Sequence, residues 1–231
     1  MTDEIQSAID NASTLTELDD IYRPFRPKRK TRASVAKAKG LQGLADAIYA
    51  QDNGSKSPIE LAVDYLSDEV ETAEDAVNGA KDIIAEMVSD DPAGRKMLRY
   101  SIKNNGMLLV TGAEEELGVY EMYKEYSEPI KSIPGHRILA VNRGEKEGFL
   151  KVAIDYDKIT ALTILNNLHI KNNSPTTDTV IEAIEDAYTR LIFPSIEREI
   201  RNTLTDGAST SAIEVFAKNT RQLLMQPPIA G

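Results

Sequence analysis

The sequence predicts a mainly α, multihelical protein with helix-turn-helix-like elements and a minor β-hairpin or small sheet. Apolar residues recur three and four positions apart through most of the 231-residue chain, which is the spacing of amphipathic helices. Proline, glycine and asparagine separate these segments, whereas the alternation typical of a strand is clear only over 148–154. With 41% apolar residues, a chain of this length can bury a substantial core.

The first predicted helix spans 14–21. Thr14 is a good N-cap residue, and Glu17 follows at the spacing of a capping box. The buried apolar stripe of this helix is expected to consist of Leu15, Leu18 and Ile21. Pro24 and Pro27 then predict extended backbone over 23–29, because proline cannot donate a helical hydrogen bond and disfavours helix in the residue before it.

The next predicted helices are short, and a longer one follows over 72–88. Pro58 after Ser57 fits the first turn of a helix, and Gly106 follows the last helix of this region. The short helices are expected at 31–40, 41–48, 58–66 and 92–104. We therefore expect a helical, helix-turn-helix-like subdomain over 1–105. A second helical subdomain, with a small β element and long C-terminal helices, is expected over 106–231.

In the second half, the apolar run 107–110 and the alternating stretch 148–154 are expected to pair as a minor sheet. Helices are predicted at 119–126, 134–143, 177–191, 196–204 and 212–224, and a short helix or irregular connector at 157–169. Pro194 is expected to kink or restart the helix that contains it. In the polar stretch 142–148, Gly144 is expected to cap the preceding helix and Gly148 to open the following strand.

Composition excludes several classes of site. The chain has no cysteine, which removes disulfides, zinc–thiolate sites and cysteine nucleophiles, and it has only two histidines, His136 and His169. No phosphate-binding loop, dinucleotide fingerprint or nucleophile elbow occurs, so we expect no catalytic residue, cofactor or metal. No apolar run approaches the roughly 20 residues that span a bilayer, and the acidic N-terminus lacks the pattern of a signal peptide. A cytoplasmic protein without membrane association is therefore expected.

Charge is distributed unevenly along the chain. The net charge is −10, yet the segment 21–45 contains eight cations and no carboxylate, so the remainder carries −18. These cations are Arg23, Arg26, Lys28, Arg29, Lys30, Arg32, Lys37 and Lys39. Cations so closely spaced need counter-charge, which can come from acidic helices of the same protein or from an external polyanion such as RNA or DNA. The sequence leaves both alternatives open.

Three stretches together resemble signatures of the bacterial Tex family of transcription accessory proteins. The first is 15–22 (LTELDDIY) with Pro24, Phe25, Pro27 and 28–33 (KRKTRA). The second is 133–137 (IPGHR) with Ala140 and 143–148 (RGEKEG). The third comprises 187–188, 190–191, 194–199 (PSIERE), 201–202 and 226–228 (QPP). Their order and spacing agree across nearly the whole chain, which makes the resemblance specific.

The resemblance implies that the chain is a fragment of a longer protein. Tex proteins have a helical N-terminal region, an RNase-H-like (YqgF-type) domain, helix-hairpin-helix elements and a C-terminal S1-type domain, to which nucleic-acid binding is largely attributed. The chain would be the N-terminal and central helical region that precedes the RNase-H-like domain. It would act in transcription or its regulation as a scaffold, with the RNase-H-like and S1-type domains as intramolecular partners.

Two functions follow from this reading. If the fragment itself touches RNA or DNA, the candidate residues are Arg23, Arg26, Lys28, Arg29, Lys30 and Arg32. The family-signature residues His136, Arg137, Arg143 and Glu145 are expected to be structural. The alternative is a protein-interaction module that docks on transcription or translation machinery without direct contact with nucleic acid.

Overall fold

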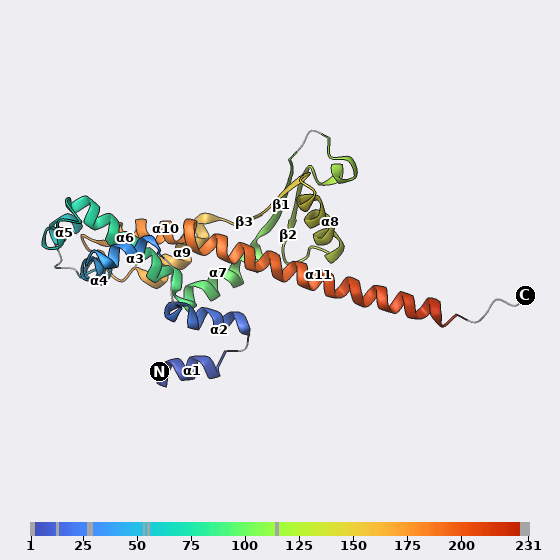
Figure 1. The fold of residues 1–231 in the computed structure, drawn as a ribbon, viewed down its shortest axis with the longest axis horizontal. Helices are drawn as coiled ribbons and strands as arrows, with labels where there is room; N and C mark the ends of the chain where they lie inside the picture. Colours follow the sequence, from blue (N-terminus) through green and yellow to red (C-terminus); the bar gives the residue numbers. More distant parts are fainter. Residues whose placement is uncertain are drawn as a thin grey trace, which may run out of the picture. The chain divides into compact units, whose positions relative to one another are not determined.

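The computed structural model describes residues 3–226 except 13, 27–29, 53, 55, 114 and 115 (Figure 1). The described part is mainly helical with one small three-stranded antiparallel sheet, which confirms the predicted fold class. It forms two compact units, one of Met1–Arg99 with Lys158–Ser195 and one of Tyr100–Asp157 with Ile196–Gly231. Each unit consists of two separate stretches of the chain. The division into domains 1–105 and 106–231 stays a prediction.

The first unit is built around one helix, α6 (Ala73–Asp90), which packs against α3, α4, α5 and α10. Its buried apolar residues repeat at helical spacing, as the sequence predicts: Ala76, Ala80, Ile83, Ile84 and Val88. Around it lie α1 (Asp3–Asp10), α2 (Leu15–Tyr22), η1 (Arg23–Phe25), α3 (Arg32–Ala38), α4 (Gln42–Ala50), α5 (Pro58–Ala62), η2 (Val63–Tyr65), α9 (Lys158–His169), α10 (Thr177–Asp186) and the π-helical turn η4 (Ala187–Ile192). Helices α7 (Pro92–Asn105) and α11 (Phe193–Leu224) contribute residues to both units.

Side-chain caps fix the starts of several of these helices. The Thr14 hydroxyl accepts a hydrogen bond from the Glu17 amide at 3.2 Å, as predicted. Ser57 and Glu60 form a complete capping box at α5, with Pro58 in its first turn. Between α3 and α4 the chain turns within three residues, where Gly40 adopts a φ of +81° that favours glycine. This short turn fits the expected helix-turn-helix-like element.

Helix α2 is held by charge, and its predicted apolar stripe is wrong at Leu15 and Leu18, whereas Ile21 is half-buried. Leu15 is 84% exposed and Leu18 is 37% exposed, whereas the buried residue of this helix is Asp20. The Asp20 carboxylate accepts hydrogen bonds from Arg95 Nε at 2.7 Å and from Arg99 at 2.6 Å, and all three residues are buried. Ion pairing to α7 therefore decides which face of α2 turns inward.

A second buried polar cluster surrounds His169, at the end of α9. Its Nδ1 lies 2.8 Å from the Tyr49 hydroxyl, and its Nε2 lies 3.6 Å from the Asp91 carboxylate. The buried Gln51 side chain donates to the carbonyl of His169 at 2.8 Å. Burial lowers the pKa of His169, an effect that nearby Asp91 opposes and Lys171 adds to.

The second unit contains the sheet, in the order β2-β1-β3. Strand β1 (Met107–Gly112) pairs with both β2 (Glu125–Pro129) and β3 (Leu150–Asp155). On the buried face, Leu108 lies opposite Ile154 and Val110 opposite Val152. The alternation in β3 is as predicted, whereas the expected helix 119–126 is the 3₁₀ helix η3 (Gly118–Tyr123) followed by β2, which contains Tyr126.

Helix α8 (Gly135–Lys146) continues past Gly144, so the predicted cap at Gly144 is wrong. Gly144 is buried inside the helix, where an added Cβ would lie 2.5 Å from Leu150 Cδ1 and 3.0 Å from Tyr120 Cδ1. The C-terminal glycine is Gly148, with a φ of +87°. Its amide donates to the carbonyl of Glu145, and the Phe149 amide donates to that of Gly144, which is the Schellman arrangement.

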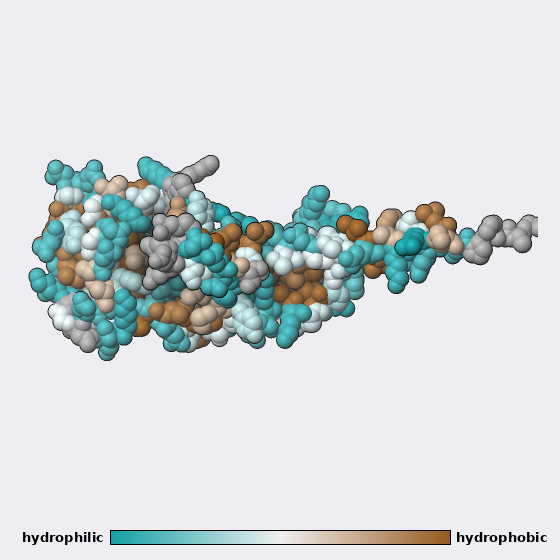
Figure 2. All heavy atoms as spheres, turned by 90° about the horizontal axis from the view of Figure 1, so that it is seen from below, coloured by the Kyte–Doolittle hydropathy of each residue, from teal (hydrophilic) through white to brown (hydrophobic). Residues whose placement is uncertain are grey.

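The helices expected at 196–204 and 212–224 are one helix, α11, which has 32 residues. Pro194 stands in its first turn, directly after the π-helical turn η4, so the irregularity expected at the proline lies before it. In the C-terminal part of α11, Ile213, Phe216 and Leu224 are exposed, and Figure 2 shows apolar surface there beside the grey terminal residues. Across the described ranges, no helix combines the length and apolarity needed to cross a membrane.

Replacing Asp20 with asparagine should lower the free energy of unfolding by about 3–5 kcal/mol, because two buried guanidinium groups would lose their carboxylate. Asp19 is the matched control, since it is exposed and pairs with Arg26 at 2.8 Å. Asp19→Asn should cost less than about 1 kcal/mol. Urea unfolding followed by circular dichroism measures both changes, and equal costs would contradict the role given to Asp20.

Replacing Gly144 with alanine should cost about 1–3 kcal/mol, because the methyl group would overlap Leu150 in a packed interior. Gly207, in the middle of α11, has nothing within 4 Å of an added Cβ. Gly207→Ala should therefore stabilise the chain by up to about 1 kcal/mol through helix propensity. Thermal unfolding of the two variants tests the contrast, and shifts of the same sign would be evidence against it.

The stability of the first unit should depend on pH through His169. Its folded pKa lies below the ordinary value of 6.5, so the unfolded chain binds a proton first as the pH falls. Stability is therefore fully present above about pH 6.5 and decreases below it. His169→Gln should reduce the loss between about pH 7.5 and about pH 5.5, as measured by urea midpoints. The exposed His136 supplies the control, and a His136→Gln variant with the same reduction would refute the assignment.

Candidate nucleic-acid interface

The six candidate cations fall in different surroundings. The extended backbone predicted around Pro24 is wrong over 23–25, because the proline fits the first turn of the 3₁₀ helix η1, which Arg23 opens. Arg26 follows η1, whereas Lys28 and Arg29 lie outside the described residues. Lys30 is exposed just before α3, and Arg32 is exposed as its first residue. The structure thus separates cations that bind carboxylates of the first unit from cations that face solvent.

An acidic row on α6 neutralises part of the basic segment 21–45. Asp82, Glu86 and Asp90 are spaced four residues apart, so they share one helix face. The Lys37 ammonium lies 3.1 Å from Glu86, and the guanidinium of Arg23 lies 3.8 Å from Asp90. This row is the internal counter-charge that the sequence left open as one alternative.

Arg23 and Arg26 are both engaged by the protein. The Arg23 guanidinium lies 3.5 Å from the Ser195 hydroxyl, and its pKa is lowered by burial and by the neighbouring Arg95. Arg26 pairs with Asp19 at 2.8 Å, and its guanidinium carbon lies 5.9 Å from the centre of the Tyr22 ring. Arg26 remains half-exposed, so its pairing with Asp19 is a surface contact that an anion can compete with.

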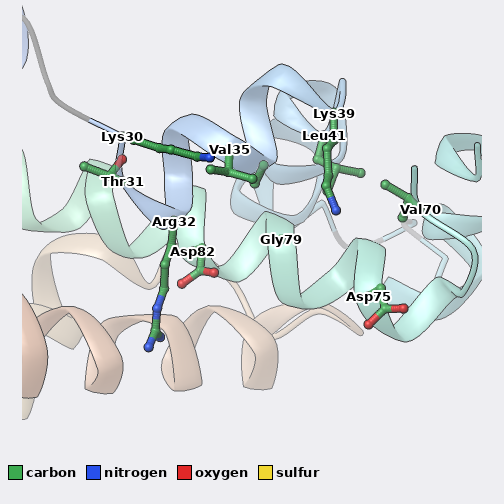
Figure 3. Close-up of a pocket in the computed structure, with 11 residues that line it drawn as sticks. Lys30, Thr31, Arg32, Val35, Lys39, Leu41, Val70, Asp75, Gly79 and Asp82 are labelled. Carbon is green, nitrogen blue, oxygen red and sulfur yellow. The ribbon is translucent and has the colours of Figure 1, made fainter.

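A groove of about 450 Å³ lies between α3 and α6 (Figure 3). Its floor is apolar and its rim is charged; the lining residues are Lys30, Thr31, Arg32, Val35, Ala36, Lys39, Leu41, Val70, Asp75, Gly79 and Asp82. Gly79 has no side chain because Leu41 fills that space, with its Cδ1 2.4 Å from where a Cβ would stand.

The two walls of the groove differ in charge. Lys30 and Lys39 are exposed on the α3 side, and neither pairs with a carboxylate within the described ranges. On the α6 side, Asp82 lies 3.3 Å from Arg190. Burial raises the pKa of Asp82, an effect that Arg190 and Arg32 oppose. The α3 side of the groove is therefore the side that can attract an anion.

Lys39 belongs to the basic segment but is not among the six candidates that the sequence predicts, and neither are two exposed aromatic rings. Tyr22 is 52% exposed and Phe25 is 55% exposed, beside the first cations of the segment. Aromatic residues interleaved with arginine were the available signal, because rings and cations together are typical of single-strand binding surfaces.

The four residues of the second signature lie in the other unit. Arg137 pairs with Glu128 at 2.9 Å, and Arg143 pairs with Glu147 at 2.9 Å. The Glu145 carboxylate pairs with Arg201, which also donates to the carbonyl of Val152 at 3.2 Å. His136 is exposed in the first turn of α8. Three of the four thus tie α8 to its own last turn, to the sheet or to α11.

Comparison with known proteins identifies the family. Residues 53–216 match the family model described as Tex central region-like. The chain is 44% identical to "Uncharacterized protein YdcI" of Bacillus subtilis (strain 168), over 100% of this chain and 33% of that protein. It is 32% identical to "Transcriptional accessory protein Tex" of Neisseria gonorrhoeae, over 99% of this chain and 31% of that protein. It is 27% identical to "S1 RNA-binding domain-containing protein 1" of Pongo abelii, over 100% of this chain and 25% of that protein.

The chain thus spans at most about a third of the length of these curated relatives. The family match covers most of the chain and includes α6, the sheet, α8 and most of α11. On this match the chain belongs to the Tex family.

Proposed function

We propose that this chain is the helical scaffold of a transcription accessory protein that binds RNA or DNA as a full-length molecule and acts in transcription or its regulation. The names of two relatives, a transcriptional accessory protein and an S1 RNA-binding domain-containing protein, support this role. The RNase-H-like and S1-type domains that the resemblance implies would be its intramolecular partners. Transcription machinery would be an external partner, and a cytoplasmic location stays a prediction.

The basic segment contacts phosphates directly in this proposal. The observation that carries it is that Lys30, Arg32 and Lys39 are exposed to solvent. Arg23 and Lys37, in contrast, pair with carboxylates of α6. Lysine and arginine contacts to phosphate are independent of base sequence and weaken as salt rises, because binding releases condensed counterions. The segment would therefore position the full-length protein on nucleic acid without selecting a base sequence.

The remaining signature residues act in structure rather than in chemistry. Arg137 and Arg143 each hold a carboxylate at 2.9 Å, and Glu145 holds Arg201, which supports a structural role for these side chains. His169 is hydrogen-bonded to Tyr49 with its pKa lowered by burial, as a structural histidine would be. We infer that the chain is not an enzyme.

The groove between α3 and α6 favours a second function, docking of another protein. Its floor of Val35, Leu41 and Val70 contains no aromatic ring on which a base could stack. An apolar floor with a charged rim is instead typical of sites that receive a helix or an extended protein segment. This function would need no direct contact between the chain and nucleic acid.

Reversing four cations of the basic segment should weaken binding of single-stranded RNA by the full-length protein. The test variant changes Lys28, Arg29, Lys30 and Arg32 to glutamate, which leaves Arg23 and Lys37 with their carboxylates. The slope of log affinity against log salt should flatten by up to about 0.7 for each phosphate that the variant no longer binds. Fluorescence anisotropy with labelled RNA at a series of salt concentrations measures both quantities.

The matched control changes Lys131, Lys146, Lys151 and Lys218, which are exposed and lie outside the basic segment, to glutamate. It has the same net charge as the test variant, so a difference between them reports the position of the charges. Equal affinities and equal slopes for the two variants would contradict phosphate contact by the segment and would leave protein docking as the better function.

A further inference from the structure

Two aromatic side chains stand in water next to the most basic stretch of the chain. Tyr22 ends α2 and is 52% exposed, and Phe25 ends η1 and is 55% exposed. Five of the seven residues that follow Phe25, over 26–32, are lysine or arginine. Exposed apolar area of this size is unfavourable in water, so a ligand that covers both rings would be favoured by burial as well as by charge.

Local structure fixes the backbone that joins the two rings. Pro24 has a fixed φ and stands in the first turn of η1, so one tight helical turn joins Tyr22 to Phe25. Arg26 reaches back to Asp19 on α2 at 2.8 Å and lies over the Tyr22 ring. Arg23 is directed to Ser195 and Asp90 instead. Arg26 therefore lies beside the rings at the surface, whereas Arg23 binds η1 to other residues of the first unit.

We propose that Tyr22 and Phe25 form a stacking platform for the bases of a single-stranded nucleic acid, whose phosphates bind Arg26, Lys30 and Arg32. This proposal rests on the proposed function. It adds contacts between the protein and the bases to the phosphate contacts of that function. Every base has a π-face, so such a platform tolerates any sequence while it excludes a duplex, whose bases are already stacked.

A protein partner is the competing occupant of this surface. Leu15 and Leu18 are also exposed on α2, and with Tyr22 and Phe25 they are spaced by three, four and three residues, as the anchors of a helix-docking face would be. The order of the residues favours a nucleic acid over a protein partner. Tyr22 and Phe25 adjoin the cations of the basic segment, whereas Leu15 and Leu18 lie earlier in α2. A base needs the rings, whereas an apolar protein face needs only the apolar area.

Leucine substitution separates the two occupants. Tyr22→Leu and Phe25→Leu keep apolar area and remove the π-face, and at exposed positions they should leave the circular dichroism spectrum unchanged. Affinity of the chain for oligouridylate at low salt should fall by about tenfold for each ring that is removed. The salt slope should stay as in the wild type, because the same phosphates remain bound.

The decisive comparison uses an abasic oligonucleotide of the same length and charge. It should bind the wild type and both leucine variants equally, because it offers phosphates and no bases to stack. Leu15→Ala is the matched control, since it removes exposed apolar area from the same helix without removing a ring, and it should leave oligouridylate affinity unchanged.

Three results would overturn the proposal. Wild-type affinity for oligouridylate in the leucine variants would show that the rings do not stack and would favour a protein-docking face. An equal loss of affinity for the abasic oligonucleotide would show that the substitutions disturb the cations. A wild-type chain that binds neither oligonucleotide at low salt would remove the proposed phosphate contact as well, so failure of the stacking proposal alone remains distinguishable.

Discussion

The acidic row on α6 is the interaction on which the first unit depends. One face of α6 buries the alanine and isoleucine residues that bring α3, α4 and α10 together, and the neighbouring face presents Asp82, Glu86 and Asp90. Each carboxylate meets a cation or hydroxyl from another element, such as Lys37 or Arg190. A partly buried carboxylate is costly without such a partner, so packing of α6 requires these cations to be near it. The basic segment is thereby part of the fold before it is part of any interface.

Local signals in the sequence predicted the elements well, and distant partners explain the failures. The apolar repeat of α6 and the alternation of β3 are contained in their own residues, so periodicity finds them. The inward face of α2 depends on Arg95, 75 residues away from Asp20, and no local pattern reveals that pair. Gly144 likewise looks like a helix stop until the side chain of Leu150 is seen to occupy the space of its missing Cβ.

The distinction between local signals and distant partners also applies to the candidate interface. Composition locates the basic segment 21–45 without any structure, because eight cations and no carboxylate are a property of the sequence. It cannot rank those cations, since the carboxylate that binds Lys37 is 49 residues away and Ser195, which Arg23 contacts, is 172 residues away. Only after these pairs are known do Lys30 and Lys39 stand out as cations without a carboxylate in the described part of the chain.

In the proposal, the negative net charge limits where a nucleic acid can bind. A remainder that carries −18 repels a polyanion from most of the surface, and the basic segment is where that repulsion is reversed. Within the segment, Arg23 and Lys37 are already compensated by α6, so attraction is stronger at cations without a carboxylate partner, such as Lys30 and Lys39. In the proposal, a nucleic acid steered to the segment would meet the exposed rings of Tyr22 and Phe25, whereas the lining of the groove between α3 and α6 contains no ring. In the proposal, charge therefore decides where a strand can approach, and the two rings decide where its bases can stack.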